Sequence, residues 1–122
     1  MDIESVVDDL LKIDKSVRYV AVVDEDFRLL ASRMGEGKAT ITSEQFDREF
    51  MPVVPPVIVG GAKKLKEFCG PMKGMMIRYE KVVVALYSVA RYIAIISFEP
   101  EVETPFMDRT TDAVDAIMKR IL

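Results

Sequence analysis

The segment Met72–Glu99 constrains the fold of this chain more than any other. It contains three short apolar runs, rich in β-branched and aromatic residues, that are separated by short polar breaks such as Glu80-Lys81. Runs of this length between turn residues are typical of β-strands joined by hairpins. We therefore predict a three-stranded antiparallel meander. Both alternating sets of side chains on its middle strand are apolar, which predicts cover on both faces of the sheet.

A second strand pair is predicted earlier in the chain. Val17–Val23 is a β-branched run, and Phe27–Ser32 is its predicted hairpin partner across the acidic tripeptide Asp24-Glu25-Asp26. Three adjacent carboxylates also suggest calcium, but a calcium loop needs alternating oxygen ligands, a glycine and a distal glutamate. We interpret the tripeptide as a turn.

Helices are predicted at both ends of the chain. Apolar residues recur at spacings of three and four over Asp2–Ile13, and again after Thr104-Pro105 towards Ile121. Thr104 is expected to cap the last helix and Pro105 to be its first residue. Both helices are expected to pack on the sheet.

Prolines divide the middle of the chain into two predicted helices. Ser43–Met51 follows Thr42, whose residue type favours helix starts, and ends before Pro52. A second helix is predicted over Pro55–Phe68, because proline fits the first turn of a helix but clashes inside one. Gly70 favours a helix end just beyond it.

This second helix has more apolar surface than one packing face needs. Gly60 and Gly61 should also weaken it by about 1 kcal/mol each. Two interpretations remain open: either a partner helix, most simply from a second subunit across a two-fold axis, approaches the glycines, or these residues pack on the sheet and the glycines loosen a bend. The apolar residues concerned are Val53, Val54, Val57, Ile58 and Val59.

Composition narrows the classes of function. A chain of 122 residues, half of them apolar, is the size of one domain, and we predict a single domain over residues 1–122. Its net charge is −3 and its basic residues are scattered among acids, so no nucleic-acid partner is expected. No apolar run reaches the roughly 20 residues of a membrane span, so no membrane partner is expected. An acidic start and a lone Cys69 indicate a cytoplasmic protein.

No catalytic or cofactor site is apparent in the sequence. Histidine is absent, which removes the commonest general base and metal ligand. The acidic tripeptide at 24–26 and Cys69 lack a visible base or orienting partner. We predict that the chain is not an enzyme and has no catalytic residues, no metal and no cofactor.

The predicted order of elements is α-β-β-α-β-β-β-α. It corresponds to an α+β fold in which helices sandwich a five-stranded antiparallel sheet, with the middle helix on one face and the terminal helices on the other. This order resembles the roadblock (dynein light chain) fold and its longin and profilin-like relatives. More narrowly, the segment from Leu11 to Val20 resembles small archaeal proteins of unknown function. The segments that carry the wider resemblance are Val17–Asp24, Phe27–Ser32, Arg78–Tyr87 and Tyr92–Ser97.

The resemblance implies a homodimeric adaptor or regulator. Roadblock proteins typically pair the central strand and the middle helix across a two-fold axis, and they bind small GTPases or scaffold motor and signalling complexes. Pro52, Pro55 and Pro56 depart from the family's continuous middle helix and leave the geometry of such a dimer open. Mapped onto this chain, the protein interface would contain Val54, Val57, Ile58, Gly61, Met75, Ile77 and Tyr79.

The alternative function is a small-ligand sensor of the PAS-like or profilin-like kind. Such a site needs a concave apolar pocket with a few polar groups. Cys69 would lie near that pocket. The residues expected to line it are Phe68, Met72, Met75, Met76 and Tyr87.

Overall fold

The protein is described by a computed structural model, which places residues 2–38 and 54–122, without the side chains of Val54 and of residues 104–108. The helix expected over Ser43–Met51 lies outside these residues. In chain order the elements are α1 (Ile3–Leu11), β1 (Val17–Asp24), β2 (Leu29–Met34), α3 (Val54–Lys63), α4 (Lys66–Cys69), β3 (Gly74–Arg78), β4 (Val83–Val89), β5 (Tyr92–Phe98), α5 (Thr104–Met118) and the 3₁₀ turn η1 (Lys119–Ile121).

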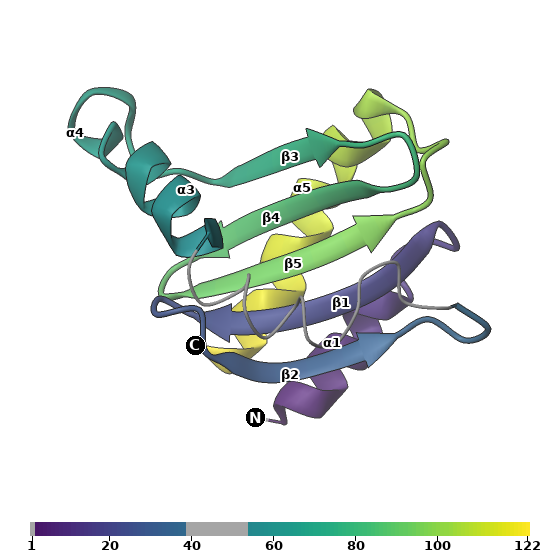
Figure 1. Ribbon diagram of the computed structural model, residues 1–122. Coiled ribbons are helices and arrows are strands. Elements are labelled where there is room, and N and C mark those ends of the chain that lie inside the picture. The colour runs from purple at the N-terminus through teal and green to yellow at the C-terminus, as the bar shows by residue number, and fades with distance from the viewer. Residues whose placement is uncertain (1, 39–53) are drawn as a thin grey trace.

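The five strands form one antiparallel sheet in the order β2-β1-β5-β4-β3 (Figure 1). The predicted meander is confirmed as β3, β4 and β5. The upstream hairpin joins it through β1 and β5, with Val20 opposite Ile96 and Val22 opposite Ala94. This order leaves β2 and β3 as the two edges of the sheet.

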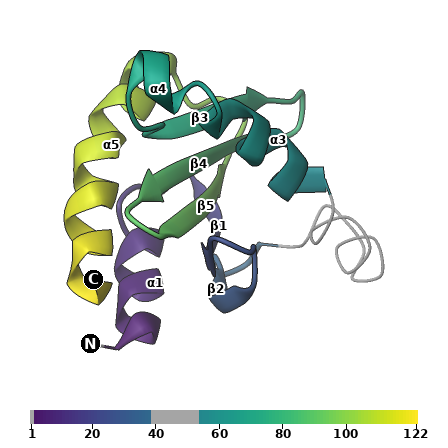
Figure 2. The same cartoon turned by 90° about the vertical axis from the view of Figure 1, so that its left-hand side faces the viewer.

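Helices α1 and α5 lie side by side on one face of the sheet, and α3 lies on the other (Figure 2). The expected placement of terminal and middle helices is therefore confirmed. The larger core fills the space under α1 and α5. Its fully buried members with the largest side chains are Val6, Val7, Leu10, Val20, Val22, Val83, Ile96, Phe98, Val114 and Met118.

The start of α1 follows from its first residues. Asp2 is the N-cap, and its carboxylate accepts a hydrogen bond of 3.0 Å from the backbone N–H of Glu4. The apolar stripe then turns Val6, Val7 and Leu10 inward. Arg120, after α5, binds α1 through Asp9 at 2.5 Å.

The prediction that Thr104 caps the last helix is wrong. Helix α5 already includes Thr104, and Glu103 is the N-cap, with an extended backbone and no side-chain capping bond. The predicted apolar face is confirmed where side chains are described, because Val114 and Met118 are fully buried.

The acidic tripeptide is a turn, as predicted. The Asp24 carboxylate accepts hydrogen bonds from the backbone N–H of Asp26 at 2.9 Å and of Arg28 at 3.0 Å. Phe27 has a φ of 61°, which belongs to the turn and not to a strand. The second strand therefore begins at Leu29, two residues later than predicted.

The helix predicted over Pro55–Phe68 is two helices. Its start is confirmed, because Pro55 and Pro56 lie in the first turn of α3. The break comes at Lys64 and Leu65, whose N–H groups bond three residues back to Gly61 and Ala62. The short α4 follows and ends at Gly70, whose φ is 83°, as the glycine there predicts.

None of the helices within residues 2–38 and 54–122 is long and apolar enough to cross a membrane.

Candidate protein-interaction surface

Helix α3 presents an apolar face away from the sheet. Of its side chains at 55–63, only Val59 is buried, and it packs in the smaller core on this side of the sheet. Val57 is 71% exposed and Ile58 is 46% exposed. Residues 57, 58 and 61 are one and four positions apart, so they share the helix surface opposite Val59. The α3 face thus consists of Val57, Ile58 and Gly61.

The glycines of α3 have no role in packing within the described chain. A Cβ atom built on Gly60 or on Gly61 meets no atom of the described residues within 4 Å. Each glycine weakens a helix by about 1 kcal/mol relative to alanine. Packing within the described residues therefore does not require glycine at either position. The absence of a side chain at Gly61 leaves the α3 face open to close approach by another helix.

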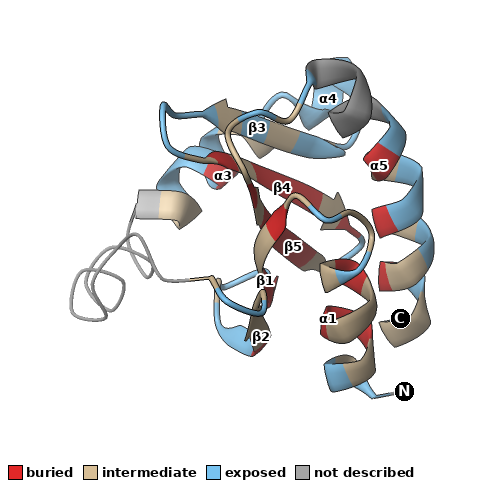
Figure 3. Cartoon of the chain, turned by 90° about the vertical axis from the view of Figure 1, so that its right-hand side faces the viewer, coloured by how far each residue is buried: buried red, intermediate tan, exposed pale blue. Residues whose placement is uncertain are grey.

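Strand β3, which follows α3 and α4 in the chain, forms one edge of the sheet. Within the described residues it pairs only with β4. Met75 lies opposite Leu86 and Ile77 opposite Val84, so both side chains point to the side of the sheet that carries α3. Figure 3 shows β3 in intermediate and exposed colours beside the buried β4 and β5. An edge strand offers unpaired backbone groups to a further strand.

The α3 face and the β3 edge contain most of the predicted interface residues. Met75 and Ile77 are partly buried, and Tyr79, just past β3, is 54% exposed. Val54 is the first residue of α3, and its side chain is not described. Whether these residues form an interface stays a prediction.

Solved structures that superpose on this chain include MglB proteins and a roadblock/LC7 domain. Myxococcus xanthus MglB superposes with a TM-score of 0.74 at 16% identity, covering 98% of this chain and 93% of that one. The roadblock/LC7 domain from Streptomyces avermitilis gives 0.72 at 6% identity, covering 99% and 98%. An MglB with a tetrameric arrangement gives 0.64 at 13% identity, covering 98% and 89%. The chain has a roadblock-type fold.

No protein-family model matches this chain, and no curated protein matches it. The similarity therefore establishes the roadblock-type fold, while the narrower resemblance to archaeal proteins stays a prediction.

The residues expected to line a ligand pocket do not surround one cavity in this roadblock-type fold. Tyr87 points to the α1 and α5 side, where its hydroxyl group meets that of Thr110. Met75 and Met76 lie on opposite faces of β3. Phe68 is 84% exposed on α4. The structure gives the sensor alternative no support from these residues.

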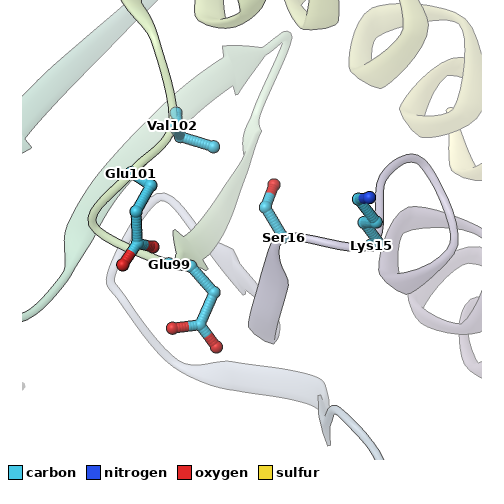
Figure 4. A pocket seen from close by; sticks show the side chains of 5 residues that line it. All are labelled: Lys15, Ser16, Glu99, Glu101 and Val102. Carbon is cyan, nitrogen blue, oxygen red and sulfur yellow. The ribbon is translucent and has the colours of Figure 1, made fainter.

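A shallow pocket lies elsewhere, where β5 ends and β1 begins (Figure 4). Two of its polar groups already have partners: Ser16 donates to Asp14, and the Glu99 carboxylate binds Arg18 at 3.1 Å and Lys38 at 2.5 Å. These pairings explain the local fold and leave no activated acid or base at Glu99. The pocket has a volume of about 290 Å³ and is lined by Lys15, Ser16, Glu99, Glu101 and Val102.

Residues 2–38 and 54–122 contain no group of three or more Cys, Asp or Glu side chains placed to hold a metal ion. The predictions of no catalytic residue, no cofactor and no enzymatic activity stay predictions.

Sequence reasoning missed one exposed feature. Leu65 is 57% exposed and Phe68 is 84% exposed, at a corner where the sequence predicted a continuous helix and a pocket wall. The lysines at 63, 64 and 66 were a signal that this stretch faces solvent.

Proposed function

We propose that this chain is a non-enzymatic homodimeric adaptor or regulator of the roadblock type. The observation that carries the proposal is the α3 face, where Val57 and Ile58 are exposed on a helix whose opposite side already packs on the sheet. An apolar helix face without cover, beside an edge strand, is a surface that association with another polypeptide would bury.

A second copy of the same chain fits this surface. A two-fold axis brings the same patch of both subunits together, so apolar α3 faces meet each other. The same axis allows two β3 edges to pair antiparallel and extend the sheet. Gly61 would then let the two helices approach closely, a role that packing within the described residues of one subunit does not require.

The solved relatives support assembly as a property of this fold. One MglB structure has a tetrameric arrangement. Those proteins are at most 16% identical to this chain in the comparisons above, so they support association in general and leave its geometry to experiment.

The partner class that we propose is a small GTPase. This step rests on the resemblance to roadblock proteins, which bind such partners through a surface composed by both subunits. An adaptor role agrees with a chain that contains no histidine.

The dimer is tested by the solution mass of the purified protein, measured by light scattering over a range of concentrations. The wild-type chain should have twice the mass of one subunit, and Val57→Glu and Ile58→Glu should each produce a monomer. Leu29→Glu is the matched control, because Leu29 is 60% exposed on the other sheet edge. A wild-type chain that stays monomeric at high concentration would refute the dimer.

The partner class is tested separately with purified small GTPases from the same source, loaded with GDP or with a non-hydrolysable GTP analogue. Nucleotide-dependent binding to the wild-type dimer, weakened by Val57→Glu, is expected. If the protein dimerises but binds none of them in either nucleotide state, the adaptor binds another class of protein.

A further inference from the structure

We propose that the corner formed by residues 63–73 binds the surface of an anionic lipid membrane. This lysine corner consists of the end of α3, the one-turn helix α4 and the approach to β3. In Figure 1 it lies at one corner of the molecule, beyond the start of β3. The proposal goes beyond the adaptor function and does not depend on it.

The first observation is the exposure of large apolar side chains. Phe68 is 84% exposed, the largest value among the exposed large apolar residues of the described chain, and Leu65 is 57% exposed. No residue of α4 is buried. An exposed aromatic side chain close to an exposed aliphatic one on a short helix suits insertion at a membrane interface.

The second observation is positive charge around these two side chains. The segment 63–73 carries four lysines, at positions 63, 64, 66 and 73, against the single Glu67, while the whole chain has a net charge of −3. The segment 63–73 therefore has a net charge of +3, and the rest of the chain has a net charge of −6. Such a basic cluster next to exposed apolar residues attracts anionic lipid head groups.

The third observation is that this charge is not neutralised internally. Several other basic residues form ion pairs, including Arg18 with Glu99, Arg33 with Glu4 and Arg120 with Asp9. Within the part of the chain that the structure describes, none of the four lysines of the corner forms one. The acidic turn between β1 and β2 lies at a different corner of the molecule (Figure 1).

The shape and chemistry favour a lipid surface over an acidic protein. Phe68 is 84% exposed, so a protein partner would need a pocket shaped to its side chain, whereas a bilayer adapts to an exposed side chain. The charges are ammonium groups on flexible stems, which suit a fluid layer of head groups and lack the fixed fork that arginine offers to a carboxylate. The corner would hold the protein on a membrane surface without spanning it, in contrast to the sequence-based expectation of no membrane partner.

Vesicle sedimentation tests the proposal. The probes are vesicles of phosphatidylcholine alone and vesicles that also contain phosphatidylglycerol. The wild-type chain should bind only the second kind and lose binding as salt is raised. Lys64→Gln with Lys66→Gln should weaken binding about tenfold or more, and Phe68→Ser about tenfold. The matched controls, Lys12→Gln with Lys81→Gln and Leu122→Ser, should bind as the wild type does.

Fluorescence supplies an independent measurement, because the chain contains no tryptophan. In the Phe68→Trp variant the emission should shift to shorter wavelength when phosphatidylglycerol vesicles are added, as expected for an indole entering the interface. The Leu122→Trp variant, at an exposed position near the end of the chain, should show no shift.

The outcomes separate the alternatives. No binding to phosphatidylglycerol vesicles at low salt overturns the proposal, as does equal weakening in the control variants or no spectral shift in Phe68→Trp. Binding to poly-glutamate without binding to vesicles also overturns it and assigns the lysine corner to an acidic polypeptide. The Val57→Glu variant retains the corner, so failure to dimerise and failure to bind vesicles are distinguishable results.

Discussion

The phenolic oxygen of Tyr87 lies 2.9 Å from the hydroxyl oxygen of Thr110, and this hydrogen bond joins β4 to α5 inside the larger core. Because a buried hydrogen bond contributes about 1 kcal/mol net, Tyr87→Phe should lower the free energy of unfolding by about that amount. Urea unfolding measures the change. Tyr92→Phe, at a partly exposed position, is the control and should change the free energy by less than about 0.5 kcal/mol.

The same tyrosine predicts a loss of stability in alkali. Burial raises the pKa of Tyr87, although the hydrogen bond with Thr110 acts in the opposite direction. Above the ordinary tyrosine value of about 10 the unfolded chain releases this proton while the folded chain still holds it. The contribution of Tyr87 is therefore complete below pH 10 and is lost as pH rises through the folded pKa. Unfolding free energies measured on both sides of pH 10 should fall more steeply for the wild type than for Tyr87→Phe.

Glu99 predicts a change on the acid side. The hydrogen bond from Lys38, followed by that from Arg18, holds the pKa of Glu99 below its ordinary value. Its contribution is present above the ordinary glutamate pKa and is lost as pH falls through the folded one. Glu99→Gln should lower the unfolding free energy at neutral pH by a few tenths of a kcal/mol, because the groups are partly exposed. The difference from wild type should shrink as the pH falls through the lowered folded pKa of Glu99, and the neighbouring Glu101→Gln serves as control.

Gly74 is required by the close packing of β3 on β4. A Cβ atom at this position would lie 2.8 Å from the backbone carbonyl oxygen of Leu86, closer than a Cβ and a backbone oxygen can approach. Gly74→Ala should therefore destabilise the fold by about 1–3 kcal/mol, or detach β3 from the sheet. Thermal unfolding measures the loss of stability, and the NMR signals of the β3 backbone amides report whether the strand has detached. An unchanged melting temperature would contradict this close approach of β3 to β4.

The glycines of α3 allow the dimer to be tested without adding a charge. Gly60→Ala and Gly61→Ala should each stabilise the isolated subunit by up to about 1 kcal/mol, because alanine favours helix and neither Cβ meets an atom of residues 2–38 or 54–122 within 4 Å. Gly61→Ala should nevertheless weaken dimerisation, while Gly60→Ala is the control for helix propensity. Stability and dissociation constant are measured separately. If both variants dimerise as the wild type does, the helices do not meet closely at Gly61.

Hydrogen exchange tests the pairing of the sheet edges. In a dimer joined through β3, the backbone amides of Gly74–Arg78 should exchange slowly, and the Val57→Glu variant should lose part of this protection. The amides of Val83–Val89 serve as the internal reference, because β4 lies between β3 and β5 in either state. Equal protection of the β3 amides in the wild type and in Val57→Glu would exclude this edge from the interface.

Local patterns in the sequence predicted the elements well where one face of a segment is buried. The alternation over Val83–Val89 predicted which side chains share a face, and Val83, Ala85, Tyr87 and Val89 indeed pack under α1 and α5. The prolines predicted the start of α3 within one residue. Prediction fails where the local signal is weak. Thr104 has a capping residue type but lies inside α5, and no residue pattern marks the break before α4 at Lys64 and Leu65.

For the proposed interaction surface, too, some properties follow from the sequence and others only from the tertiary structure. The sequence alone determined that the chain has helices and strands in this order, and that its middle helix carries more apolar residues than one face uses, because both properties follow from the spacing of neighbouring residues. Only the tertiary structure decided that Val59 turns inward while Val57 and Ile58 stay outside, that β3 is an edge, and that Phe68 projects from a lysine corner. Those properties depend on contacts between residues far apart in the chain, such as the pairing of β1 with β5, which no local pattern contains.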